Sequence, residues 1–98
     1  MSRYTDYRQM VEAAVGRGRD RGENAGQIRA HVDACAPAAT RTDALCYRRG
    51  VRRAWLQARF DVLWHEGLLS AEELTRARRV IESSPLVSAC REMKEAAP

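Results

Sequence analysis

The stretch that decides the fold covers residues 40–66 and reads TRTDALCYRRGVRRAWLQARFDVLWHE. No proline interrupts it, and Gly67 follows it at the place where a left-handed glycine commonly ends a helix. Its apolar residues recur at helical spacing and not in the alternating pattern of a strand. The stretch therefore predicts one long helix, beginning at Thr40 or Thr42, around which the rest of the chain packs.

Four shorter helices are expected to surround this one. Asn24 with Gln27, and Ser70 with Glu73, have the spacing of capping boxes that begin helices. Pro85 has the position of a first helical residue. The expected helices cover residues 3–16, 24–36, about 70–83, and a final one from Ser84 with an apolar stripe of Leu86, Ala89, Cys90 and Met93.

The segment from Gly16 to Gly22 holds three glycines in seven residues, which predicts a loop between the first two helices. No strand-like alternation and no internal repeat occur elsewhere. We therefore expect an all-α fold, in which residues 1–98 form a single domain. Its architecture would be a compact bundle of about five helices around the long central helix of residues 40–66.

The composition suits a small domain without a membrane span. The chain has 98 residues, of which 45% are hydrophobic, and no apolar run approaches the roughly 20 residues that cross a bilayer. Its three cysteines include no CxxC pair, and no secretory apolar region opens the chain. We expect reduced thiols and a cytoplasmic location.

The central stretch has two apolar sectors when its residues are placed at about 100° intervals around a helix. One sector contains Ala44, Tyr47, Val51, Trp55, Ala58 and Val62, and the other contains Leu45, Leu56, Phe60 and Leu63. Between them lie Arg41, Arg48, Arg52 and Arg59, while Arg49 and Arg53 flank the second sector. A surface helix with one neighbour needs one apolar stripe, so this helix is expected to contact neighbours on two sides.

Residues 41–59 hold six arginines and one acid, a net charge of +5, whereas the whole chain carries +4. Two interpretations follow. The arginines pair internally with acids of the last third of the chain, namely Glu72, Glu73, Glu82 or Glu92. Alternatively, they meet an acidic protein surface or a phosphate backbone.

A row of small side chains follows the same helix at four-residue spacing: Cys46, Gly50, Ala54 and Ala58. Small residues let a second helix approach closely. The row indicates close packing against the first or last helix of the same chain, or alternatively the seam of a homodimer or the docking site of a partner helix.

Motifs for chemistry are not found in the sequence. His31, His65 and the scattered cysteines have no metal-ligand spacing, and no phosphate-binding loop or nucleophile motif occurs. We expect no enzyme activity, no metal and no cofactor.

These observations favour a protein–protein interaction module. In size and composition the chain resembles small bacterial or phage accessory proteins that bind and block a larger regulator or defence complex. The expected function is to bind and modulate or inhibit a larger protein, such as a transcription regulator, in the manner of an antiactivator. The expected apolar anchors are Leu56, Phe60, Leu63 and Trp64, and the expected rim contacts are Arg48, Arg49, Arg52 and Arg53. The alternatives are nucleic-acid binding through the arginines of the central helix, and a structural homodimer.

Overall fold

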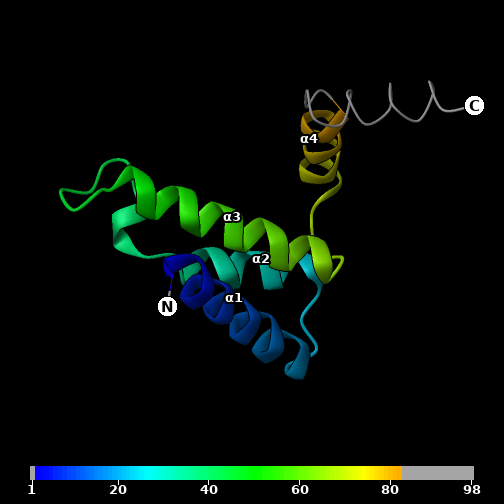
Figure 1. The fold of residues 1–98 in the computed structure, drawn as a ribbon. Coiled ribbons are helices and arrows are strands. Elements are labelled where there is room, and N and C mark those ends of the chain that lie inside the picture. The colour runs from blue at the N-terminus through cyan, green and yellow to red at the C-terminus, as the bar shows by residue number, and fades with distance from the viewer. Residues whose placement is uncertain (1, 83–98) are drawn as a thin grey trace, which may run out of the picture.

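The computed structural model of the protein describes residues 2–82 and shows helices joined by short connections (Figure 1). The helices are α1 (Arg3–Asp20), α2 (Ala25–Ala34), a short 3-10 helix η1 (Ala38–Thr40), α3 (Arg49–His65) and α4 (Ala71–Glu82). No strand occurs in this part of the chain, so the all-α prediction is confirmed for it. The helix expected from Ser84, with Leu86, Ala89, Cys90 and Met93, lies outside the described residues.

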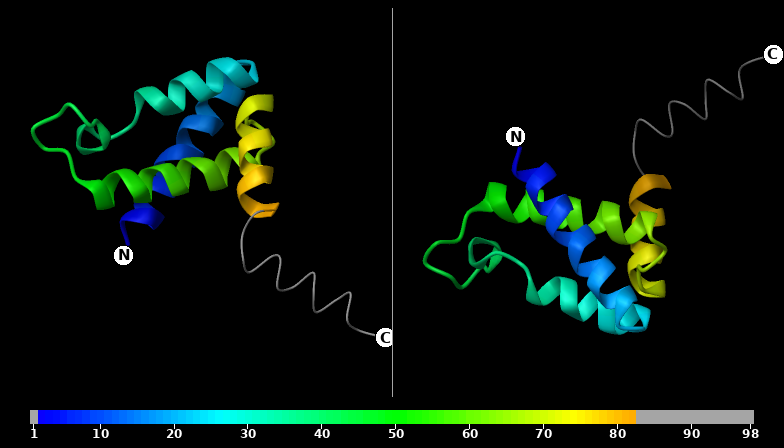
Figure 2. Two further views of the ribbon diagram at one scale, coloured as in Figure 1. Left: turned by 90° about the horizontal axis from the view of Figure 1, so that it is seen from above. Right: turned by 90° about the horizontal axis from the view of Figure 1, so that it is seen from below.

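Helices α1, α2 and α3 form the core. Helices α2 and α3 run antiparallel, and α1 crosses both of them diagonally on one side (Figure 2). The Tyr7 ring of α1 meets the Trp55 ring of α3 edge to face, with centroids 5.8 Å apart. The buried side chains of the core cluster are Val11, Ala14, Val15, Ile28, Val32, Trp55, Val62, Leu63 and Leu68.

The long central helix is the main prediction that the structure corrects. Helix α3 begins at Arg49 and not at Thr40 or Thr42, and residues 41–48 form a loop of turns. With 18 residues, α1 is longer than the 17-residue α3. Among residues 2–82 the structure has four α-helices, and no single helix dominates the bundle.

Polar side chains explain the late start of α3. Thr40 is buried, and its hydroxyl donates a hydrogen bond to the carbonyl oxygen of Pro37 at 2.6 Å. The chain then turns back, and the backbone N–H of Arg48 donates to the carbonyl oxygen of Ala39 at 2.9 Å. Threonine and aspartate side chains compete in this way with helical hydrogen bonds, and residues 40–43 contain three of them.

The glycine-rich segment is helical, which is a second correction. Helix α1 continues through Gly16 and Gly18 to Asp20. Gly18 fits there because a Cβ atom would lie 2.7 Å from Cγ1 of Ile28, so only glycine lets α1 and α2 approach this closely. The helix ends at Asp20, and Gly22 follows its C-cap with a φ of +70° and an N–H that donates to the carbonyl oxygen of Arg19 at 3.0 Å.

The expected end of α3 at Gly67 is confirmed. Gly67 has a φ of +68°, and its N–H donates to the carbonyl oxygen of Trp64 at 3.1 Å. The next N–H, of Leu68, donates to the carbonyl oxygen of Leu63 at 2.8 Å. These two hydrogen bonds make a Schellman motif, which brings Leu68 into the core beside the end of the helix.

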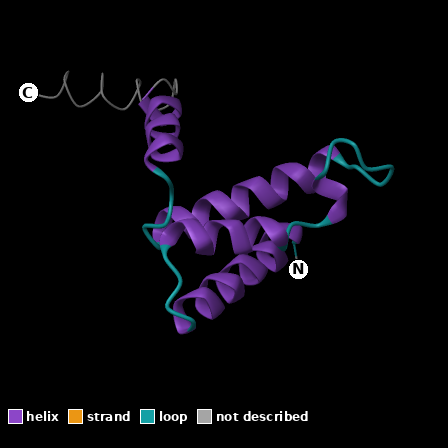
Figure 3. Ribbon diagram, turned by 180° about the vertical axis from the view of Figure 1, so that it is seen from behind, coloured by secondary structure: helices purple, strands orange, loops and turns teal. Residues whose placement is uncertain are grey.

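The helix starts that the sequence predicts at Asn24 and Ser70 are confirmed. Asn24 and Gln27 form a complete capping box, with both hydrogen bonds at 2.9 Å. The Oγ atom of Ser70 accepts a hydrogen bond from the N–H of Glu73 at 3.1 Å. Helix α4 then turns away from the axis of α3 and stands apart from the three-helix core (Figure 3). Ala77 of this helix is buried, whereas Val80 is exposed.

Candidate functional site

Helix α3 has a core face that meets the rest of the bundle. Val51, Trp55, Ala58 and Val62 are buried, as the first apolar sector predicted. The other two predicted members of that sector, Ala44 and Tyr47, lie in the loop before the helix. The core therefore uses about one side of α3.

A second face of α3 points away from the core, and we call it the outer face. It consists of five residues at intervals of four, three, four and four, which place them within about 80° around the helix. These residues are Arg49, Arg53, Leu56, Phe60 and Trp64.

Large apolar side chains are exposed on this outer face. Leu56 is 47% exposed and Trp64 is 39% exposed, and Phe60 is partly buried. The rings of Phe60 and Trp64 lie against each other, with centroids 5.5 Å apart. Three of the four expected anchors thus line up on one accessible stripe.

Leu63, the fourth expected anchor, is a core residue. Its side chain is 0% exposed and belongs to the same buried cluster as Leu68. The Schellman motif explains this position, because the turn after α3 returns the chain next to Leu63. Leu63 is therefore not available for contact with a partner.

Arg59 is paired inside the chain, as one of the two interpretations of the arginines predicted. Its Nε atom lies 2.6 Å from Oδ1 of Asp33 on α2, and its Nη1 atom lies 2.8 Å from Oε2 of Glu73 on α4. Burial alone would lower the pKa of Arg59, but the hydrogen bonds to the two carboxylates outweigh it and raise the pKa. The hydrogen bond from Arg59 lowers the pKa of Glu73. Arg59 thus joins three helices through these ion pairs.

The other arginines of this stretch differ in their surroundings. Arg41 lies 3.7 Å from Asp43 within the exposed loop, and Nη1 of Arg52 donates to the carbonyl oxygen of Thr40 at 3.1 Å. Arg48, Arg49 and Arg53 are exposed, and none of them forms an ion pair with an acid among residues 2–82. Within this stretch, the exposed arginines that form no ion pair among residues 2–82 therefore lie at the start of α3.

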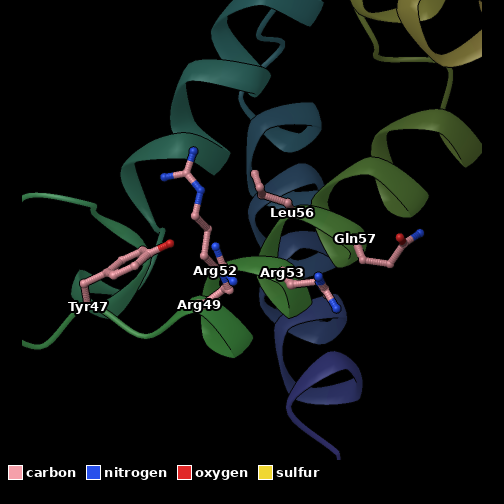
Figure 4. Close-up of a pocket in the computed structure, with 6 residues that line it drawn as sticks. All are labelled: Tyr47, Arg49, Arg52, Arg53, Leu56 and Gln57. Carbon is pink, nitrogen blue, oxygen red and sulfur yellow. The ribbon is translucent and has the colours of Figure 1, made fainter. Parts of the chain in front are cut away.

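Three of these arginines line a shallow hollow of about 430 Å³ (Figure 4). Tyr47, from the loop, lies at one side of it and Arg53 at the other. Leu56 and Gln57 close its end toward the middle of α3, and the complete lining is Tyr47, Arg49, Arg52, Arg53, Leu56 and Gln57. The sequence did not single out Gln57, although its position one residue after Leu56 places it beside the outer face.

Two further hollows continue along the same helix. One lies between α3 and α4, where Gln57 and Phe60 meet Glu73, Arg76, Ala77 and Val80. The other is lined by Phe60 and Trp64 together with Arg8, Asp61 and His65. Because neighbouring hollows share Gln57 or Phe60, they form a continuous uneven surface from the arginine end of α3 to its last turn.

The row of small residues does not form one seam. Cys46 lies exposed in the loop, and a Cβ on Gly50 would meet nothing within 4 Å. Ala54 is partly buried, and Ala58 is fully buried. The row therefore runs from open surface into the monomer core, because α3 begins only at Arg49 and removes Cys46 from the pattern.

Several other features of the described residues bear on function. No group of three or more His, Cys, Asp or Glu side chains among residues 2–82 is arranged to hold a metal ion. None of the described helices has the length and apolarity that crossing a bilayer requires. Comparison of the chain with family models, with curated proteins and with solved structures finds no match.

Proposed function

We propose that this protein is a small interaction module that binds a larger protein through the outer face of α3 and thereby modulates or inhibits it. The observation that supports this proposal is the apolar stripe of Leu56, Phe60 and Trp64, in which Leu56 and Trp64 are exposed and Phe60 is partly buried. The expected kind of target is a transcription regulator or a defence complex, because such assemblies can be blocked by occupying one interaction surface.

The stripe has the composition of a binding patch and is not needed for the core. The opposite side of α3 already supplies Val51, Trp55, Ala58 and Val62 to the interior. Aromatic side chains such as Trp64 dominate the energy of many protein interfaces when a partner desolvates them. Arginines at the edge of an apolar patch are typical of an interface rim.

A photo-crosslinking experiment tests the proposal. The photoreactive residue p-benzoylphenylalanine would replace Trp64 in the full chain, and Met10 on α1 is the matched control because both side chains are 39% exposed. In extract of the native host, we expect one specific protein to be crosslinked from position 64 and not from position 10. Phe60→Ala should reduce that product about tenfold or more, without changing the far-ultraviolet circular dichroism. Equal products from both positions would contradict the proposal.

Nucleic-acid binding is the second candidate function, supported by the unpaired charges of Arg48, Arg49 and Arg53. These residues span only about two turns of α3, whereas the rest of the outer face is apolar. A phosphate backbone is charged along its whole length, so the apolar part would be left unused. Titration with labelled duplex and single strands of about 20 nucleotides at low salt separates the two functions. Steeply salt-dependent binding that Arg49→Glu abolishes and Trp64→Ala leaves intact would favour nucleic acid.

A further inference from the structure

We infer that the partner presents an amphipathic helix with acidic side chains near one end, which lies along the outer face of α3 with its acidic end at Arg49 and Arg53. This inference rests on the proposed function and specifies the chemistry of the partner. It combines the spacing of the outer face, the distribution of its charge and the polar groups at its far end.

The spacing of the outer face suits a helix. Intervals of four, three, four and four residues keep Arg49, Arg53, Leu56, Phe60 and Trp64 in one line, as in helices that pack side by side at a small angle. From Arg49 to Trp64 this line is about 22 Å long at 1.5 Å per residue. A partner helix of about 15 residues would cover it. Helices recognised in this way carry apolar residues at intervals of three and four.

The positive charge of the outer face indicates that one end of the partner helix carries acidic side chains. Arg49 and Arg53 face the solvent without an acidic partner among the described residues, and they line the same hollow. A guanidinium group binds a carboxylate through two parallel hydrogen bonds. Helix α3 also begins without a side-chain cap at Arg48, so its positive dipole end adds to the attraction for acids.

The end of the outer face at Trp64 disfavours acidic side chains. This difference between the two ends determines which way the partner helix lies along α3. Asp61 lines the hollow beside Trp64, and its carboxylate accepts hydrogen bonds from the Tyr4 hydroxyl and from Nε2 of Gln57. The hydrogen bond to Asp61 raises the pKa of Tyr4. Arg8 also lines this hollow, and its Nε atom lies 3.1 Å from Oε1 of Glu12, with which it forms an ion pair. An acidic end placed here would meet Asp61, whereas an apolar end would meet Phe60 and Trp64.

A second copy of this chain is a poorer occupant. The outer face carries two arginines and no acid, so two copies of it would not neutralise each other. A helix of complementary charge would pair with both arginines while it covers the apolar stripe. Self-association through this face is therefore an outcome that the experiment must be able to reveal.

Selection from a peptide display library tests the inference with the full chain. The library would present peptides of about 20 randomised residues, long enough to span the outer face. Sequences bound by the wild-type protein would be compared with those bound by Phe60→Ala. We expect the Phe60-dependent sequences to show apolar residues at intervals of three and four, with Asp or Glu clustered in the turns at one end.

Charge reversal provides the matched control. The double variant with Arg49→Glu and Arg53→Glu should select Lys or Arg in the same turns. Synthetic peptides from the two selections should each bind their own version of the protein about tenfold or more tightly than the other version. Selected peptides without clustered acids, peptides rich in proline, or identical selections by both versions would overturn the inference.

The two proposals can fail separately. A partner crosslinked at position 64, together with selected peptides that lack acids, would leave the interaction module standing and remove the acidic helix. Absence of both results would remove the proposed function as well. A crosslinked product with the mass of two copies of this chain would replace the acidic partner by a homodimer.

Discussion

The core face and the outer face of α3 both carry large apolar side chains, but the two faces differ in how far these side chains are buried. Trp55 is 3% exposed and lies edge to face against Tyr7, whereas Trp64, nine residues later on the same helix, is 39% exposed. The difference comes from the neighbours and not from the side chains, because α1 crosses only one side of α3. Apolar periodicity therefore locates faces that need a partner, but it does not say whether the partner belongs to the same chain.

The tryptophan pair gives the largest expected contrast. Trp55→Ala removes a buried ring and should lower the free energy of unfolding by about 3–5 kcal/mol, enough to unfold a domain of this size. Trp64→Ala should change it by less than about 1 kcal/mol, because the ring is already partly solvated. Urea denaturation followed by circular dichroism measures both. Equal losses in the two variants would place Trp64 in the core and refute its role as a contact residue.

A glycine pair extends the comparison of inner and outer faces to α1. In Gly18→Ala the new Cβ would lie 2.7 Å from Cγ1 of the buried Ile28, and such overpacking costs about 1–3 kcal/mol. This cost exceeds the gain of about 1 kcal/mol from the better helix propensity of alanine. In Gly16→Ala nothing lies within 4 Å, so the variant should be more stable by about 0.5–1 kcal/mol. Thermal melting should thus shift in opposite directions, and a stabilised Gly18→Ala would show that α1 and α2 are not closely packed.

An arginine pair tests the same contrast for charge. Arg59→Met keeps the apolar stem but loses the ion pairs to Asp33 and Glu73, and should cost about 1 kcal/mol. Its clearest effect should be faster hydrogen exchange in α4, which Arg59 connects to α2 and α3. Arg53→Met should leave exchange unchanged because Arg53 has no ion pair among the described residues. Unchanged exchange in both variants would show that the ion pairs do not hold α4.

The smallest expected effect is a dependence of α4 on pH. The pKa of Glu73 is lowered from its ordinary value of 4.5, chiefly by the hydrogen bond from Arg59. The ionised carboxylate therefore contributes stability above its unfolded pKa, and this contribution is lost as the pH falls through the lower pKa of the folded state. Hydrogen exchange in α4 should accelerate below about pH 4.5 more in the wild type than in Glu73→Gln. Parallel pH profiles would show that Glu73 does not contribute.

The sequence predicted the elements whose signals are local. Asn24 with Gln27, and Gly67 at the end of α3, need only nearby backbone atoms, and both form as expected. The core face of α3 was also predictable, since Val51, Trp55, Ala58 and Val62 share one side of any helix that contains them. For the candidate site, the arrangement of Leu56, Phe60 and Trp64 follows from their four-residue spacing.

The remaining features depend on contacts between distant segments. Gly18 lies within α1 where the chain packs closely against Ile28 of another helix, and a count of glycines does not reveal that contact. Leu63 is buried because the chain after Gly67 returns beside it. Thr40 did carry a local signal, since threonine competes with helical hydrogen bonds, but the absence of proline between residues 40 and 66 outweighed it in the prediction.

Hydrogen bonds connect the two ends of the loop of residues 41–48. The Arg48 N–H binds the carbonyl oxygen of Ala39, and Nη1 of Arg52 binds that of Thr40. Between these two hydrogen bonds, Leu45 is fully exposed to solvent, and Cys46 is exposed. A protease cut or an inserted tag between these two residues should therefore leave the helices assembled. The loop is thus a natural position for splitting the chain into two fragments that reassemble, with the outer face of α3 left intact in the second fragment.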